Sequence, residues 1–221
     1  MRGRLSLKAA ATGLLGLSAL LLGLTVRAVP QTTFYARNLP WIIARATALA
    51  ALILLAVLVA VGILMSHPVN RTVWRQTKQM LVWHRYLTVF VVALVALHVA
   101  AIVLDLYAHV SLVGALVPGY AAYRTPAVAL GTLSLYAMLL TALTASHAEK
   151  LPPKVWLYVH RGAILVFALA WTHGLLAGSD SIALRPLYLA LAGLVVAAAA
   201  TRYWLEIPRT RMALPQGGKE A

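Results

Sequence analysis

Six long apolar segments constrain the fold of this chain more than any other feature. They lie at about residues 9–26, 41–66, 79–106, 125–146, 155–177 and 184–204. Each has roughly the 20 apolar residues that an α-helix needs to cross a hydrocarbon core about 30 Å thick. Only 11% of the residues are charged, against about 25% in soluble domains. The sequence therefore predicts an all-α integral membrane bundle of six transmembrane helices, one domain over residues 9–204.

Basic residues at both ends of the chain predict its orientation. Residues 1–8 form a basic head and residues 205–221 a basic tail. Six spans place both ends on one side, together with 14 of the 19 Lys and Arg, and such an excess marks the cytoplasmic side. This bias accounts for the net charge of +14, so we expect no nucleic-acid partner. A basic head before an apolar run also occurs in secretory signals, but Val26-Arg27-Ala28 is a poor cleavage site, which favours a retained first helix.

The chain contains no cysteine. Disulfides, thiolate zinc sites, iron–sulfur clusters and covalently attached c-type haem are therefore excluded. Any metal site must be built from other side chains.

Histidines occur in two matched pairs within the apolar segments. His84 and His98 lie 14 residues apart in the third segment, and His160 and His173 lie 13 apart in the fifth. A helix separates such residues by roughly 20 Å. The third and fifth helices of a six-span bundle are parallel, so we expect His84 opposite His160 near the cytoplasm and His98 opposite His173 near the outside. Facing imidazoles suit axial ligation of haem iron, which predicts two stacked b-type haems between these helices.

The spacing is less regular in the fifth segment than in the third. At about 100° per residue, 14 residues return a helix to within about 40° of the starting face, whereas 13 leave about 140°. Either the fifth helix is tightened between its histidines, or two haems approach it from different sides. Gly162 and Gly174, each beside a histidine, are candidates for making room for a porphyrin.

Three arginines are candidate contacts of haem propionates. Arg45 lies about a turn inside the second segment, where it either reaches to the interface or faces a propionate. Arg85 and Arg161 directly follow the inner histidines. They either anchor the helices at the cytoplasmic surface or neutralise the propionates of the inner haem. The other three histidines, His67, His109 and His147, lie at segment ends or in loops, where a structural role is expected.

The two histidine segments resemble a known family. WHRYLTVFVVALVALH and WLYVHRGAILVFALAWTHGLLAGSD resemble the ferric reductase-like transmembrane domain over roughly residues 41–200. That superfamily includes ferric reductases, NADPH oxidases and the haem subunit of the bacterial methionine sulfoxide reductase system. The resemblance implies that the haem ligands fall on His84, His98, His160 and His173. It also implies that Arg45 lies near the outer haem.

Two departures from the family pattern narrow the expected function. No glycine-rich dinucleotide fingerprint occurs, and only about 17 residues follow the last predicted helix, so we expect no flavin or NAD(P)H site in the chain. Ile102 stands where similar NADPH oxidases have another histidine, which disfavours dedicated superoxide production. The size of the chain resembles the methionine sulfoxide reductase haem subunit, which implies a multi-pass protein of the bacterial inner membrane.

Three functions remain open on the sequence. The leading one is a di-haem b-type cytochrome carrying electrons from a cytosolic flavin reductase or quinol to a periplasmic oxidoreductase or ferric iron. FMN or a quinone is the further cofactor that these donors suggest. The alternatives are a quinol-oxidising cytochrome b subunit of another redox complex, and a haem-free membrane transporter or assembly factor.

Overall fold

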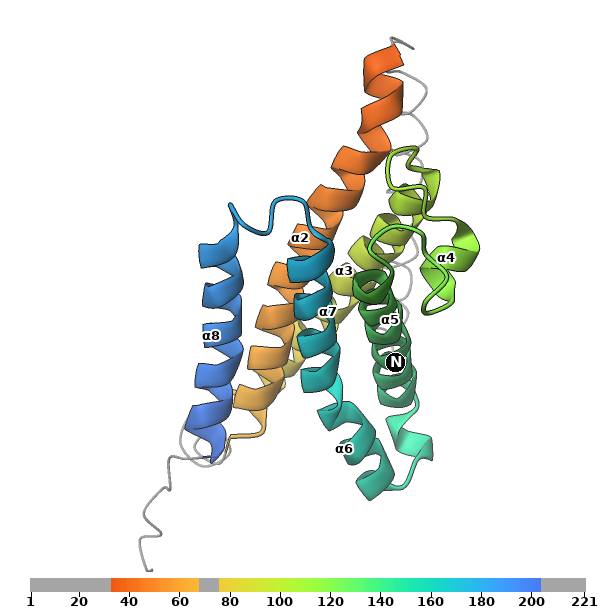
Figure 1. Cartoon of the computed structure of the whole chain (residues 1–221). Helices are drawn as coiled ribbons and strands as arrows, with labels where there is room; N and C mark the ends of the chain where they lie inside the picture. The colour runs from red at the N-terminus through yellow and green to blue at the C-terminus, as the bar shows by residue number, and fades with distance from the viewer. Residues whose placement is uncertain (1–32, 68–75, 204–221) are drawn as a thin grey trace, which may run out of the picture.

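The structure is a computed structural model that describes residues 33–67 and 76–203 (Figure 1). Within these ranges the chain is helical and contains no strand. The elements are α2 (Thr33–Met65), α3 (Thr77–Leu104), α4 (Leu112–Leu116), α5 (Thr125–Ser146), the 3₁₀ helix η2 (Ala148–Lys150), α6 (Pro153–Arg161), α7 (Ala163–Ala177) and α8 (Arg185–Tyr203). The predicted head, first span and tail, at residues 1–8, 9–26 and 205–221, lie outside the described residues.

Four helical stretches in the described ranges are long and apolar enough to cross a membrane. They are Asn38–Met65, Thr77–Leu104, Thr125–Ser146 and Pro153–Ala177. The helix α8, with 19 residues, is not among the four. The chain is thus a multi-pass membrane protein, and the prediction of an all-α membrane bundle is confirmed. The predicted count of six spans includes one that lies outside the described residues.

The second span starts earlier than the sequence indicated. We predicted that the second span begins at about residue 41, after a polar loop at residues 27–40, whereas α2 begins at Thr33 and contains Pro40 within the helix. A proline removes one backbone hydrogen bond and strains the turn before it, but it does not end this helix, which begins seven residues before Pro40. The loop prediction over residues 33–40 is therefore wrong.

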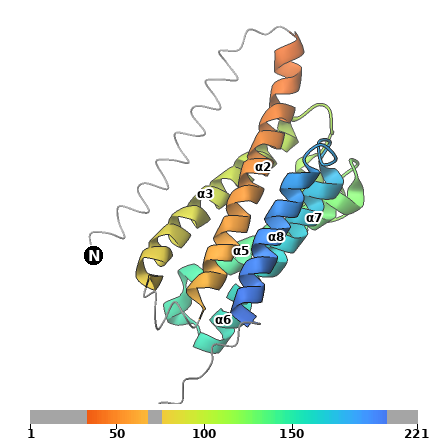
Figure 2. The same cartoon turned by 90° about the vertical axis from the view of Figure 1, so that its left-hand side faces the viewer.

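The helix α2 lies at the centre of the bundle. It packs against α3 on one side and α8 on the other, and it also contacts α7, while α5 packs along α7 (Figure 2). The core between these helices includes Leu55, Ala56, Val59, Val91 and Val166, all at most 6% exposed. Small side chains such as Ala56 let membrane helices approach closely.

The helix α3 is attached to the bundle along one side. Among the described elements it packs along α2 and touches α4, and it makes at most slight contact with α5, α6, α7 and α8. One layer of the protein is thus α2 with α3, and the other is α5 with α6 and α7. The histidines of α3 face the second layer across the space between them.

The fifth span is interrupted between its two histidines. Helix α6 ends at Arg161 and α7 begins at Ala163, with Gly162 between them, and the two helices differ in direction (Figure 1). The amide of Gly162 donates to the carbonyl of Val159, three residues back, at 3.0 Å, as in a tighter 3₁₀ turn. A Cβ on Gly162 would lie 2.8 Å from that carbonyl oxygen. The helix is thus tightened locally at Gly162, in the direction of the first of our two alternatives, whereas the approach of two haems from different sides stays a prediction.

Candidate functional site

The inner histidine pair joins α3 to α6. The rings of His84 and His160 have their centres 6.0 Å apart, with an angle of 68° between their planes. The residues come from the first turns of α3 and the last turn of α6, so the pair lies at one end of the bundle.

The outer pair has nearly the same geometry at the other end. The rings of His98, on α3, and His173, on α7, have their centres 6.3 Å apart at an angle of 69°. Parallel third and fifth spans bring the four residues together in the two combinations expected from the sequence. A crossed arrangement, with His84 facing His173, does not occur.

Both ring separations fit one metal ion between two imidazoles. A zinc–imidazole bond is about 2.0–2.1 Å long and a ring nitrogen lies about 1.1 Å from its ring centre, so two rings on opposite sides of a metal have centres about 6.3 Å apart. Among the described residues, no group of three or more His, Cys, Asp or Glu is placed to hold a metal. Two imidazoles with no third protein ligand are the donor set of haem iron, whose remaining ligands come from the porphyrin. The side chains thus fit haem.

The outer imidazoles are fixed by backbone carbonyl groups. Nδ1 of His98 lies 2.8 Å from the carbonyl oxygen of Ala44, and Nδ1 of His173 lies 2.8 Å from that of Ala127. Because a carbonyl oxygen only accepts, Nδ1 carries the proton in each ring. Nε2 is then the nitrogen with a free lone pair for a metal, and such a hydrogen bond also raises the basicity of the ligand.

The inner imidazoles lack this support. Nδ1 of His84 and Nδ1 of His160 are buried without a hydrogen bond of good geometry, and His84 has only a weaker backbone contact, at Leu58. The indole of Trp156 instead stacks on His160, with ring centres 5.4 Å apart and planes 16° from parallel. Nε1 of Trp156 is also buried without a partner. The inner site therefore gathers three buried N–H or ring nitrogen groups that lack a hydrogen bond of good geometry.

A cavity of about 520 Å³ surrounds the outer pair. His98 and His173 line it together with mainly apolar residues of α2, α3, α5 and α7. Its polar end is formed by Arg45 of α2 and by Ser179, Asp180 and Ser181 of the turn before α8. A large apolar space with a few polar groups at one end is typical of a cofactor site.

Two glycines that we did not single out lie against the imidazoles. A Cβ on Gly131, in α5, would lie 2.8 Å from Cε1 and Nδ1 of His173, and one on Gly62, in α2, would lie 3.3 Å from Cε1 of His84. The Cβ direction of Gly174 points instead to the hydroxyl of Tyr188, at 2.9 Å. Neither Gly162 nor Gly174 faces an imidazole, but Gly174 lines the outer cavity beside His173, so a role of these glycines in making room for a porphyrin stays a prediction. No sequence signal distinguished Gly131 or Gly62 from other membrane-helix glycines.

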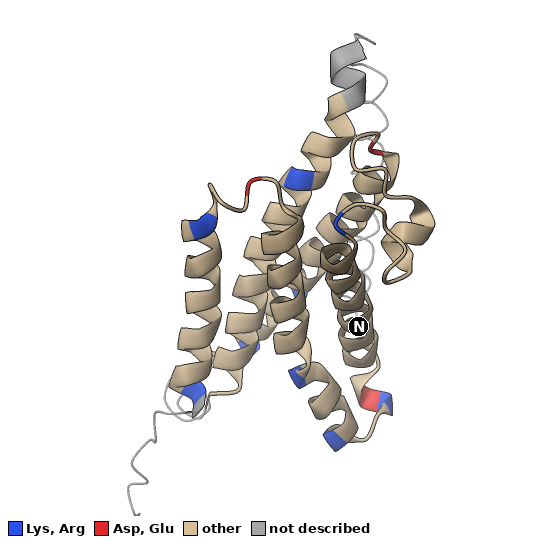
Figure 3. Cartoon of the chain, viewed as in Figure 1, with Lys and Arg blue, Asp and Glu red and all other residues tan. Residues whose placement is uncertain are grey.

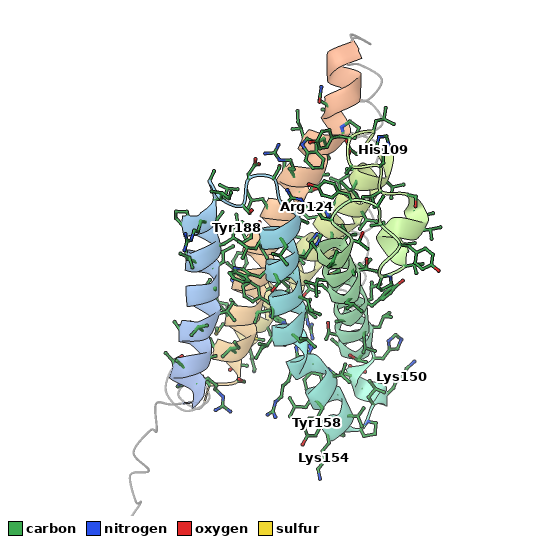
Figure 4. The ribbon with its side chains drawn as sticks, viewed as in Figure 1. His109, Arg124, Lys150, Lys154, Tyr158 and Tyr188 are labelled. Atoms are coloured by element: carbon green, nitrogen blue, oxygen red, sulfur yellow. The ribbon has the colours of Figure 1, made fainter. Side chains whose placement is uncertain are left out.

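The outer end of α7 is tied to the start of α5. The guanidinium of Arg124 donates to the carbonyl groups of Leu176, at 2.7 Å, and Gly178, at 3.4 Å, and the hydroxyl of Tyr123 donates to that of Ala177, at 3.2 Å. Arg124 precedes α5 with a φ of +40°, and Figure 4 shows it at the upper end of the bundle. These contacts fix α7 one turn beyond His173.

The three arginines that we predicted as propionate contacts lie at both ends of the bundle, Arg45 at the outer end and Arg85 and Arg161 at the inner end. Arg45 forms an ion pair with Asp180, a contact that the sequence did not reveal, and its guanidinium carbon lies 5.8 Å from the ring centre of Trp41. Arg85 and Arg161 are exposed beside the inner histidines. Propionate contacts of these arginines stay a prediction.

The remaining histidines have structural contacts. Nε2 of His67 lies 2.9 Å from the carbonyl oxygen of Thr201 and joins the ends of α2 and α8. Nδ1 of His147 lies 3.0 Å from the carbonyl oxygen of Leu143 at the end of α5. His109 occupies a loop with a φ of +49° and is seen at the upper end in Figure 4.

Comparison with known proteins gives one match. A family model described as "Ferric reductase like transmembrane component" matches residues 46–171, more than half of the chain. The match contains His84, His98 and His160 and ends two residues before His173. No curated protein and no solved structure gives a significant match to the chain.

Proposed function

The chain belongs to the ferric reductase-like transmembrane family, whose members have a membrane electron-transfer role, and we propose that it is a di-haem b-type cytochrome. In this proposal it carries electrons across the bacterial inner membrane. The observation that supports it most is the pair of facing histidine sites, each with the ring separation of a bis-imidazole metal site.

The four histidines would hold two haem groups, one at each site. His84 and His160 would hold one haem and His98 and His173 the other, the outer pair through Nε2 of each imidazole. Haem, when bound, supplies an iron that takes up and releases one electron. The surrounding apolar side chains keep water away, and the backbone carbonyl groups of Ala44 and Ala127 hold the outer rings in one orientation.

The distance between the sites suits transfer across a membrane. The 14 residues from His84 to His98 correspond to about 21 Å along a straight helix, which is about two-thirds of a hydrocarbon core about 30 Å thick. One site therefore lies near each membrane surface, with apolar residues between them.

The distribution of basic residues supports the direction. Among the side chains described in residues 38–67 and 76–202, six Lys or Arg lie at the end of the inner pair and three at the other end (Figure 3). The six are Lys78, Arg85, Lys150, Lys154, Arg161 and Arg202, and the three are Arg45, Arg124 and Arg185. This bias favours a cytoplasmic location for the inner pair, with both chain termini on that side. Electrons would enter at the inner pair and leave at the outer pair.

The donor and acceptor must complement a chain that has no dinucleotide fingerprint. We propose a cytosolic flavin reductase or a quinol as donor, so FMN or a quinone takes part at the inner side. The acceptor is then a periplasmic oxidoreductase or ferric iron. Purified protein mixed with NADPH alone should keep its haem oxidised, and a flavin reductase added to the mixture should reduce it.

The test of the proposal is haem content followed by ligand replacement. A pyridine haemochrome assay should give two non-covalent haems per chain, and one or none would contradict the proposal. His98→Ala and His173→Ala should then alter the same haem in the visible spectrum, while His84→Ala and His160→Ala alter the other. Matching spectra for His84→Ala and His173→Ala would contradict the ligand pairs.

A further inference from the structure

An ion pair between Arg45 and Asp180 lies at the polar end of the outer cavity. Arg45 belongs to α2, and Asp180 belongs to the turn between α7 and α8. Both residues line the cavity that also contains His98 and His173. The pair therefore lies at the polar end of the proposed outer haem site and joins α2 to the turn before α8.

The pair contributes little to holding the fold together. The two side chains are 40% and 43% exposed, and ion pairs of this exposure typically stabilise a protein by about 0–1 kcal/mol. The end of α7 is already tied to α5 through Arg124 and Tyr123. The position of the pair beside a candidate redox site is therefore its more informative property.

Arg45 and Asp180 are the only Lys, Arg, Asp or Glu among the described residues that line this cavity. Charges act over longer distances in an apolar surrounding than in water, because the effective dielectric constant is lower. A guanidinium near a haem iron favours the reduced state, and a carboxylate favours the oxidised state. Since the two charges are paired, their effects largely cancel.

We propose that Asp180 is a positioning residue that holds Arg45 at the cavity and balances its charge, so that neither charge alone shifts the reduction potential of the outer haem. This inference rests on the proposed function, because it needs haem between His98 and His173. It assigns a redox role to the Gly-Ser-Asp turn after the fifth span.

The proposal predicts shifts of opposite sign for the two partners. Asp180→Asn leaves an unbalanced cation and should raise the midpoint potential of the outer haem. Arg45→Gln leaves an unbalanced carboxylate and should lower it. The double variant Arg45→Gln/Asp180→Asn should return close to the wild-type potential, and Asp180→Glu should stay close to it as well.

Two controls separate this electrostatic role from a structural one. The inner haem of the same molecule should shift much less in every variant, because its ligands lie about 20 Å away along α3. Arg185→Gln removes a positive charge at the same end of the bundle but outside the lining of this cavity, and it should change the outer potential much less than Arg45→Gln. A purely structural pair would instead shift the potential in the same direction in both single variants.

The experiment is a spectroelectrochemical titration of purified full-length protein, preceded by the haem assay. Fewer than two haems in the wild-type protein would refute the proposed function itself. Two haems with opposite outer shifts that cancel in the double variant would support the role of Asp180. Two haems with outer shifts of the same sign, with equal shifts at both haems, or with no shift would overturn this inference and leave the proposed function standing.

Discussion

The inner and outer histidine pairs have almost the same ring geometry but different surroundings. Ring centres are 6.0 Å apart in one and 6.3 Å in the other. Both outer imidazoles donate from Nδ1 to a backbone carbonyl, whereas neither inner imidazole makes such a bond with good geometry and only His84 has a weaker backbone contact, at Leu58. Hydrogen bonds of this kind orient a histidine ligand and strengthen its donation to the metal. The distance between the two rings thus decides which group each site can bind. The backbone carbonyl groups that accept hydrogen bonds from the rings decide how tightly that group is bound.

The largest expected effect comes from filling the space beside each pair. Gly131→Ala places a methyl group 2.8 Å from the ring of His173, whereas Gly62→Ala places one 3.3 Å from the ring of His84. The first contact displaces the ring, and the second needs only a small adjustment. We expect Gly131→Ala to lose most of the outer haem and Gly62→Ala to keep most of the inner one, as measured by haem content and visible spectra.

Gly193→Ala is a suitable control, because no atom lies within 4 Å of the position of its added Cβ. It should leave both haems at the wild-type level. Equal haem loss in Gly131→Ala and Gly62→Ala would show that both histidine pairs tolerate an added methyl group equally. It would contradict the expected difference in packing between the inner and outer sites.

The second effect concerns how tightly each site holds haem. Outer-shell partners of metal-binding histidines typically contribute 10–100-fold to affinity. Because only the outer rings have such partners at good hydrogen-bond geometry, we expect the inner haem to dissociate faster, by about tenfold. Transfer of haem to an excess of a soluble haem-binding protein, followed at wavelengths that distinguish the two sites, measures this ratio. Faster dissociation of the outer haem would contradict the expectation that the outer site binds haem more tightly than the inner site.

The ligand candidates could be predicted from the sequence because titratable side chains such as histidine are rare in membrane-spanning segments. Four histidines in two spaced pairs stand out among apolar residues, and the parallel direction of their helices follows from counting spans. The carbonyl groups of Ala44 and Ala127 could not be predicted, because every residue has a carbonyl group and only the packing of α2 and α5 selects these two. The ion pair of Arg45 with Asp180 was missed for a similar reason, since its partners are 135 positions apart in the chain.

The helix bounds were predictable to different degrees. The span at residues 125–146 coincides with α5, where Thr-Pro starts the helix and a polar loop follows it. The start of α2 was missed because Pro40 was interpreted as a boundary, although a helix can contain a proline at the cost of one hydrogen bond. The interruption at Gly162 was implied by the 13-residue spacing, but its position depends on a single glycine that the spacing does not identify.

A third, smaller effect tests the aromatic contact of the inner pair. Trp156 stacks on His160, and such aromatic pairs contribute about 0.5–1.5 kcal/mol. Trp156→Leu should therefore weaken inner haem binding by about 2–10-fold, while Trp156→Phe, which keeps an aromatic ring, should weaken it less. Haem titration of the two variants compares them, and an unchanged inner affinity in Trp156→Leu would contradict a role for the stack.

The smallest effect is expected outside both sites. His67→Ala removes a hydrogen bond to Thr201 that joins α2 to α8, and one such bond is worth about 1 kcal/mol. We expect a modest loss of thermal stability in detergent with unchanged spectra of both haems. A change in either haem spectrum would show that His67 belongs to the redox sites after all.

The one-sided attachment of α3 has a consequence for the life of the protein in a cell. Because α3 carries one ligand of each pair and is held by α2 alone among the long described helices, the proposed haems would supply much of the contact between the two layers. The free energy of binding such a group then adds to the free energy of folding. Newly inserted chains that do not receive haem would remain open and be exposed to membrane proteases. The abundance of this protein would thereby follow the haem supply of the cell without any change in its synthesis.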